Sequence, residues 1–334
     1  MPIPLLLIGI GVGASALGIG KSVKAGVDQK EASNTNEQAQ NIVEEASNGA
    51  NTARKNSGDA ITNLGKAKIS VLESSMKPFV SSFEKLHNVE LTDSVGLDEL
   101  QKFHLDKQDF AELKEMQSMA ASIAGGVAGG AALGTITAFG AYGGAMAFGA
   151  ASTGTAIASL SGIAATNATL AFLGGGSLAV GGLGIAGGTA VLGGLVAGPA
   201  LAVMGFIVGA KANENKEKAY ANLAQAKEFK ESMEAVKSTC KAIRMRANMF
   251  ERLLLKLNAV FVPLTDSLNQ IILTSGTDYS TFTSEQKATV AASMSIAAAI
   301  KAVLDAPILT EDGALTPESQ EVADSVAGVL AAVK

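Results

Sequence analysis

The chain has 334 residues and a formal net charge of -5; 48% of its residues are hydrophobic, yet only 4% are aromatic and none is Trp. The mild negative charge, without a basic stripe, excludes the usual kind of nucleic-acid-binding surface, and a lone cysteine, Cys240, excludes an intrachain disulfide framework. The apolar residues are mostly small, whereas a densely packed soluble core uses more large side chains.

Residues 1–20 are apolar and uncharged, and the first positive residues, Lys21 and Lys24, follow this stretch. A secretory signal peptide carries its positive charge before its apolar core, so we do not expect one here. We expect a retained apolar arm over 1–20, either inserted in a membrane or packed against the apolar block further on. A signal peptide that ends near 14–16 is the alternative.

Residues 21–115 are polar and prone to form helices, and we interpret them as the first part of a helical stalk. Small residues recur there in steps of four and three, at Ala46, Ala50, Ala53, Ser57, Ala60, Leu64, Ala67 and Val71. This spacing predicts a heptad-like seam suited to close helix contact. Pro78 is expected to kink or end this helix, and a short helix near 97–117 is expected to follow.

Residues 116–210 contain no Asp, Glu, Lys, Arg or His, and this stretch of 95 residues holds 24 of the 37 glycines. Uncharged apolar stretches of about 20 residues are typical of membrane spans. Lysines flank the block on both sides, and positive residues favour the cytoplasmic side, which predicts an even number of spans. The stretch is therefore interpreted as a membrane domain.

Glycines spaced by four place their bare faces on one side of a helix, where two backbones can approach closely. The predicted helix-packing glycines are Gly126, Gly130, Gly134, Gly140, Gly144, Gly184, Gly188, Gly194, Gly198, Gly205 and Gly209. Gly182, Gly184 and Gly187 also spell G-x-G-x-x-G, the pattern of dinucleotide-binding folds. No acidic residue follows before Glu214, so the required ribose-binding acid is missing and no cofactor is expected.

Two glycine-rich halves, 119–150 and 178–209, are expected to form an antiparallel helical hairpin. The second half has thirteen Leu, Ile, Val or Phe residues and the first has six. At typical insertion energies these residues favour placing the second half in a bilayer by about 4 to 8 kcal/mol, whereas the first half is marginal alone. Insertion is therefore expected to depend on partner helices.

Residues 211–262 are predicted to form the second part of the stalk, as one amphipathic helix that Pro263 ends. Its apolar seam recurs in steps of three and four and includes Phe229, Met233, Val236, Cys240, Ile243, Phe250, Leu254 and Leu257. Within this seam Cys240 is expected to be a small buried hydrophobic residue. Residues 263–334 are predicted to hold a pair of helices near 283–305, with Ser284 as a cap, and near 316–333.

The sequence has no recognisable catalytic or metal-binding constellation. Its only histidines, His87 and His104, lie 17 residues apart, which is not a metal-ligand spacing. We therefore expect no enzyme activity, no bound metal and no small-molecule substrate.

The seams 46–71 and 226–257 on either side of the block Met116 to Ala210 resemble the α-helical pore-forming proteins of the cytolysin A type. The glycine spacing also resembles that of bacterial glycine-zipper membrane proteins. The resemblance implies an all-α fold, with a helical bundle or coiled-coil stalk and a membrane-inserting hairpin. It also implies a homo-oligomer that partners with a lipid bilayer and permeabilises it, as a toxin or defence effector does.

We expect such a protein at a membrane. A soluble cytoplasmic form that precedes insertion is compatible with this expectation. The alternatives are a membrane scaffold that does not leak, and a self-assembling shell or filament subunit.

Overall fold

The protein is all-α in every part of the chain that its computed structural model describes, namely residues 21–89, 105–126, 136–137, 139–143, 216–310 and 314–332. Within these stretches 89% of the residues are helical and no β-strand occurs. The predicted N-terminal arm and most of the predicted glycine-rich hairpin lie outside the described residues. The expected all-α class is thus confirmed over the described residues.

The chain divides into two compact units, and two of the three boundaries between them fall inside long helices. The helices are α1 (Lys21–Val71) and α8 (Lys216–Ser275). One unit comprises Met1–Ala46 and Ala200–Glu231, and the other comprises Ser47–Pro199 and Ser232–Lys334.

In the first unit, polar contacts join the two helix segments. Glu31 accepts from the ammonium group of Lys216 and from the hydroxyl of Tyr220, each at 2.7 Å. Both bonds lower the pKa of Glu31, and the bond from Lys216 has the larger effect. The amide of Asn222 donates to Asn36 at 2.9 Å. Beneath these bonds the buried residues are mostly small, namely Ala32, Ala39, Val43, Ala46, Ala219, Ala226 and Phe229.

In the second unit, the helix that begins with α1 continues past Pro78 and does not end there. A π-helical turn, η1 (Leu72–Met76), joins α1 to α2 (Lys77–Phe83). A proline ring collides with the carbonyl four residues earlier, here that of Ser74, and this carbonyl lies within the π turn. The wider turn, closed by the bond from the Lys77 amide to the Leu72 carbonyl, accommodates the proline without breaking the helix.

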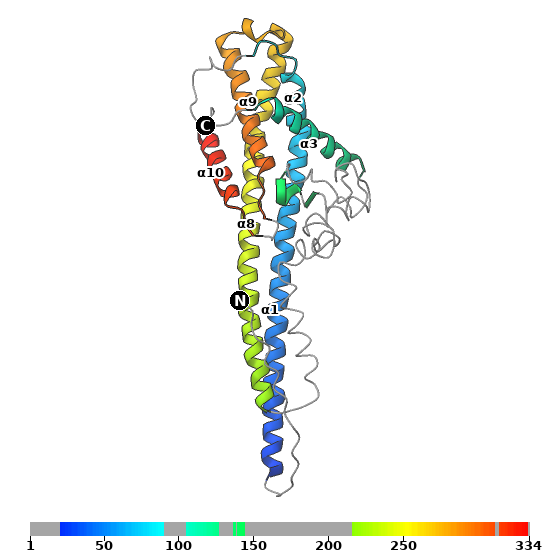
Figure 1. Cartoon of the computed structure of the whole chain (residues 1–334), viewed down its shortest axis with the longest axis vertical. Coiled ribbons are helices and arrows are strands. Elements are labelled where there is room, and N and C mark those ends of the chain that lie inside the picture. The colour runs from blue at the N-terminus through cyan, green and yellow to red at the C-terminus, as the bar shows by residue number, and fades with distance from the viewer. Residues whose placement is uncertain are drawn as a thin grey trace. The chain divides into compact units, whose positions relative to one another are not determined.

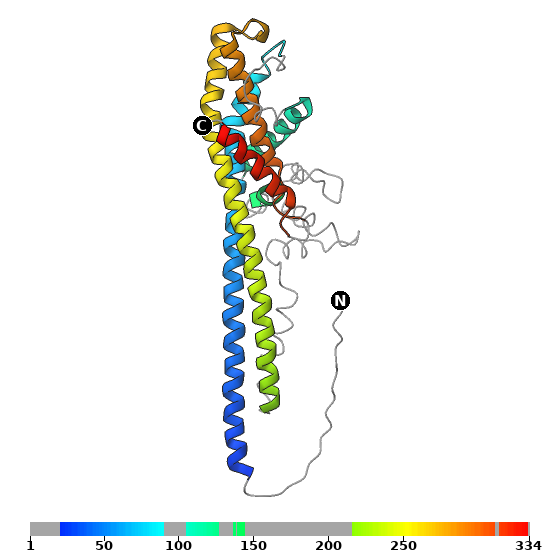
Figure 2. The same ribbon diagram turned by 90° about the vertical axis from the view of Figure 1, so that its left-hand side faces the viewer.

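Helices α1 and α8 of the second unit lie side by side and run in the same direction (Figures 1 and 2). The hydroxyl of Ser75 bonds to Asn258, and seven residues further along the first helix Ser82 bonds to Asn269. The predicted seam residues of α8 are all buried: Phe229 lies in the first unit, and the second unit holds Met233, Val236, Cys240, Ile243, Phe250, Leu254 and Leu257. Most of the small seam residues of α1 are buried as well, from Ala46 to Val71.

The prediction that Pro263 ends its helix is wrong, because α8 passes through this proline and ends at Ser275. An internal proline removes one helical hydrogen bond and costs about 3 kcal/mol. Large residues on both sides of it, Leu257, Phe261 and Leu268, are completely buried. Their burial offsets the cost of the proline, since each such side chain contributes about 1.5 to 3 kcal/mol.

Three further helices complete the second unit: α3 (Lys107–Gly126), α9 (Ser284–Asp305) and α10 (Pro317–Ala332). The two C-terminal helices lie close to their predicted positions. The cap of α9 is Thr283 and not the predicted Ser284, because Thr283 and Gln286 form a reciprocal capping box. A short 3-10 helix, η7 (Tyr279–Thr281), precedes α9.

The core of this unit is centred on an aromatic cluster that joins α2, α3 and α8. The Phe79 ring lies 5.2 Å from the Phe261 ring and 5.5 Å from the Phe83 ring, measured between centroids. Phe110 of α3 stacks on Phe83 at 5.2 Å. This cluster fixes α3, the helix that leads into the charge-free block.

Candidate functional site

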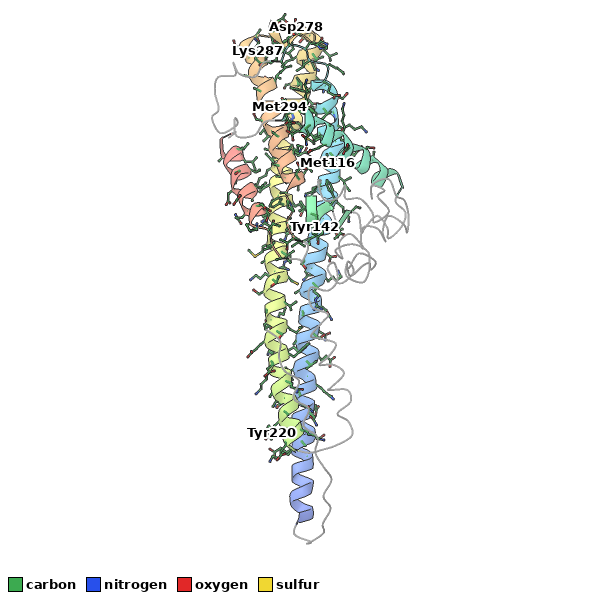
Figure 3. All side chains as sticks on the ribbon, viewed as in Figure 1. Met116, Tyr142, Tyr220, Asp278, Lys287 and Met294 are labelled. Atoms are coloured by element: carbon green, nitrogen blue, oxygen red, sulfur yellow. The ribbon has the colours of Figure 1, made fainter. Side chains whose placement is uncertain are left out.

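Part of the charge-free block packs into the helical body of the second unit. We call residues 136–137 and 139–143 the docked segment; they are helical and lie against α1 and the end of α9. Phe139, Ala141 and Tyr142 of this segment are buried. The label of Tyr142 in Figure 3 marks the position of the docked segment. The segment is the candidate functional site, because it belongs to the stretch that the sequence predicts to enter a membrane.

Glycines let the docked segment and α1 touch backbone to backbone. A Cβ atom at Gly65 would lie 2.0 Å from the carbonyl oxygen of Ile136, and one at Gly140 would lie 2.1 Å from the carbonyl oxygen of Ile61. Real Cβ atoms do not come so close, so each position requires glycine. The hydroxyls of Thr62 and Thr137, 2.7 Å apart, add a hydrogen bond next to the crossing.

The other side of the docked segment is bound by the chain that follows α9. The amides of Ile308 and Leu309 both donate to the carbonyl of Ala141, at 2.7 and 3.1 Å. Gly143 has a φ of +71°, and a Cβ there would lie 2.1 Å from the carbonyl oxygen of Asp305. Only glycine fits both the backbone conformation and the available space.

A buried lysine connects the docked segment to α1 and α9. The Lys68 side chain is completely buried, and its Nζ donates to the carbonyls of Phe139 at 3.3 Å and Leu304 at 3.0 Å. Nζ also lies 5.3 Å from the centroid of the Phe139 ring. Burial lowers the pKa of Lys68 to about 7, against a smaller opposing effect of the Asp305 carboxylate.

A second lysine, Lys301 of α9, gathers three carboxylates. Its Nζ lies 2.6 Å from Asp305, 2.7 Å from Glu112 and 3.0 Å from Asp109. Burial by itself would lower the pKa of Lys301, but the bonds to Asp305 and Glu112 raise it above its ordinary value. The pKa of Asp305 is raised, chiefly by burial. Asp305 therefore belongs to the environment of both lysines, so one network of charged groups joins α1, α3 and α9.

Most of this site is not evident from the sequence analysis. Of the predicted packing glycines, Gly140 lies in the docked segment, where its close neighbour is Ile61 of α1 and not another glycine of the block. Gly126 is the last residue of α3, and the other predicted glycines lie outside the described residues. Lys68 was missed, although the sequence holds a signal: Ile61, Gly65, Lys68 and Leu72 recur in steps of four, three and four, which places a lysine on an otherwise uncharged face.

Among the described residues, no group of three or more His, Cys, Asp or Glu side chains is arranged to hold a metal ion. Within the same residues, α9 is the one helix long and apolar enough to cross a membrane, with a mean hydropathy of 1.4 over its most apolar window. This indication is weak, because 67% of that window is buried in the structure, as in a core helix.

No protein family, curated protein or solved structure matches the chain.

Proposed function

We propose that the protein inserts into a lipid bilayer, oligomerises and permeabilises it, as α-helical pore-forming proteins of the cytolysin A type do. The observation that carries the proposal is the docked segment, a piece of the charge-free block that packs against the helical body and covers Lys68. The uncharged stretch from Met116 to Ala210 provides the apolar length that spanning a bilayer requires.

The docking contacts suit an element that is stored and later released. They include backbone contacts at Gly65 and Gly140, beside the buried side chains of Phe139 and Tyr142. The burial of Lys68 opposes docking, because an ammonium group leaves water to enter the site. Release returns that charge to water, while insertion of residues 178–209 gains about 4 to 8 kcal/mol from their large apolar side chains.

The glycine-zipper hairpin, the coiled-coil stalk and the homo-oligomer belong to this proposal. Small-residue faces without a partner inside the chain favour contact with a neighbouring copy, so assembly would accompany insertion. The parallel pair of α1 and α8, with its buried seam, would form the stalk.

The proposal is tested by fixing the docked segment in place. Thr62→Cys with Thr137→Cys, in a Cys240→Ser background, places two thiols where two hydroxyls now lie 2.7 Å apart. We expect the reduced protein to release dye from liposomes and carry single-channel current, and the oxidised protein to do neither. Each single-cysteine variant serves as a control that the oxidant alone should not affect.

The alternatives predict other outcomes of the same experiment. Liposome binding with no dye release and no current from the unaltered protein would contradict permeabilisation and favour a membrane scaffold. Failure to float with liposomes would favour a shell or filament subunit. Equal leakage from the oxidised and reduced forms would show that the docked segment does not need to leave its site.

A further inference from the structure

A groove with a volume of about 410 Å³ lies between α1 and α8 in the second unit, and no residue of its lining takes part in the docking contacts described above. Its lining comes from one face of each helix: Gly49, Thr52, Ala53 and Asn56 from α1, and Glu234, Lys237, Ser238, Cys240, Lys241 and Arg244 from α8. Three of these side chains are cationic and one is anionic. The groove therefore carries a local positive charge on a chain whose net charge is negative.

One of the three cations is already neutralised inside the groove. The methylene carbons of Lys237 lie over Gly49, 3.5 and 3.6 Å from where a Cβ would stand. Its Nζ binds Glu234 at 2.8 Å. The stem of Lys237 thus packs over Gly49, and the only acid of the lining, Glu234, is occupied.

The other two cations have no carboxylate partner among the described residues. Lys241 is exposed and Arg244 is half-buried, and their spacing of three residues places them on the same side of α8. A half-buried guanidinium group has lost part of its hydration, so an anion bound beside it gains more than at a fully exposed position. Arg244 is therefore the strongest anchor for an anion in this groove.

The neutral hydrogen-bond donors of the groove and its volume indicate which class of ligand fits it. Asn56 lines the groove from α1, opposite the two cations, and Ser238 lines it from α8, the helix that carries them. Guanidinium, ammonium, amide and hydroxyl donors together suit the several oxygens of a phosphate group. The volume lies in the range of small-molecule sites and exceeds that of inorganic phosphate, so it leaves room for a small organic substituent.

We propose that this groove binds a phosphate group, with Arg244 and Lys241 as charged donors and Asn56 and Ser238 as neutral donors. The phosphate can belong to a soluble phosphomonoester or to a lipid headgroup, since both present the same oxygens. This proposal does not rest on membrane permeabilisation, because binding is measurable in solution without a bilayer.

The test compares two charge-matched double variants of α8. Lys241→Gln with Arg244→Gln removes the groove cations, and Arg252→Gln with Lys256→Gln removes two exposed cations outside the groove lining. Glycerol phosphate and inorganic phosphate, against potassium chloride of equal ionic strength, are titrated by calorimetry. Vesicles of phosphatidylcholine with and without phosphatidic acid provide the lipid arm, read by flotation.

We expect the unaltered protein and the Arg252/Lys256 variant to bind a phosphate probe equally. The groove variant should bind it at least about tenfold more weakly, because it has lost both charged hydrogen-bond donors. Binding of glycerol phosphate would identify a soluble ligand, and flotation that requires phosphatidic acid would identify a headgroup. Equal weakening in both double variants, or no binding of any probe by the unaltered protein, would overturn the proposal.

Discussion

The ammonium nitrogen of Lys68 lies 3.0 Å from the carbonyl oxygen of Leu304, although 236 residues separate the two along the chain. Leu304 stands in the last turn of α9, where a carbonyl has no partner within the helix. A cation at a helix C-terminus also interacts favourably with the helix dipole. The same ammonium group binds Phe139 of the docked segment, so one buried charge joins three parts of the second unit.

The first prediction concerns the pH dependence that Lys68 imposes. Its pKa is lowered to about 7 in the folded protein from an ordinary value near 10.5, so the folded state binds fewer protons than the unfolded state between these values. The free energy of unfolding should therefore fall as the pH is lowered through that window, by as much as roughly 5 kcal/mol. Lys68→Met should remove this dependence.

The pH dependence caused by Lys68 is measured by denaturant unfolding at several pH values between about 7 and 10. Lys85→Met removes an exposed lysine and should leave the dependence as it is in the unaltered protein. Identical slopes for the Lys68→Met variant and the unaltered protein would show that the buried ammonium group does not control this window.

The second prediction concerns the backbone crossing at Gly65. Gly65→Ala would place a methyl group 2.0 Å from the Ile136 carbonyl oxygen, so the docked segment should separate from α1. Amide hydrogen exchange in residues 139–143 should accelerate strongly.

Gly58→Ala is the matched control, because a Cβ at that position of α1 meets nothing within 4 Å. It should leave the exchange rates unchanged and stabilise the helix by about 0.5 to 1 kcal/mol. If amide hydrogen exchange in residues 139–143 stays slow in the Gly65→Ala variant, the close backbone contact between Gly65 and Ile136 is contradicted.

The third prediction concerns the Lys301 network. Lys301→Met leaves the carboxylates of Asp305 and its neighbours without their cation, and should lower the free energy of unfolding by about 3 kcal/mol. Hydrogen bonds from Lys301 lower the pKa of Glu112 in the folded protein. The stability that the ionised Glu112 contributes is therefore present above the ordinary pKa of a Glu side chain, and it is lost as the pH falls through the lower pKa of the folded state. The variant should lose less stability in acid than the unaltered protein does.

Lys77→Met provides the comparison, because it breaks an exposed ion pair with Glu73. Such pairs contribute at most about 0.5 kcal/mol, so chemical denaturation should barely change. A loss in the Lys301→Met variant as small as that in Lys77→Met would show that the network is not stabilising.

The fourth prediction concerns the seam of α8. Ile243 is 1% exposed, so Ile243→Asp buries a carboxylate without a partner and should destabilise the fold by several kcal/mol. Met245, two residues on, is 59% exposed, and Met245→Asp should change the thermal midpoint little. Equal thermal midpoints for the two variants would indicate that the seam of α8 is exposed to solvent.

Periodicity in the sequence is a local property, and it predicted the local features of the fold. The steps of three and four from Phe229 to Leu257 identify residues that are buried, and turn residues placed the starts of α9 and α10 within a residue or two. The same reasoning failed at Pro263, because a proline signals a helix end only where no packing opposes it. Burial of Phe261 beside it is a tertiary property that the local pattern does not contain.

The sequence by itself determined the helical character of the described chain, the buried face of α8 and the extent of the stretch without charges. The tertiary structure alone decided that Gly140 packs against Ile61, that Lys68 reaches Phe139 and Leu304, and that Lys301 binds Glu112 of α3. The physical reason is distance along the chain. Helix periodicity arises from hydrogen bonds four residues apart, whereas these contacts join residues 71 to 236 positions apart and exist only after the helices have packed.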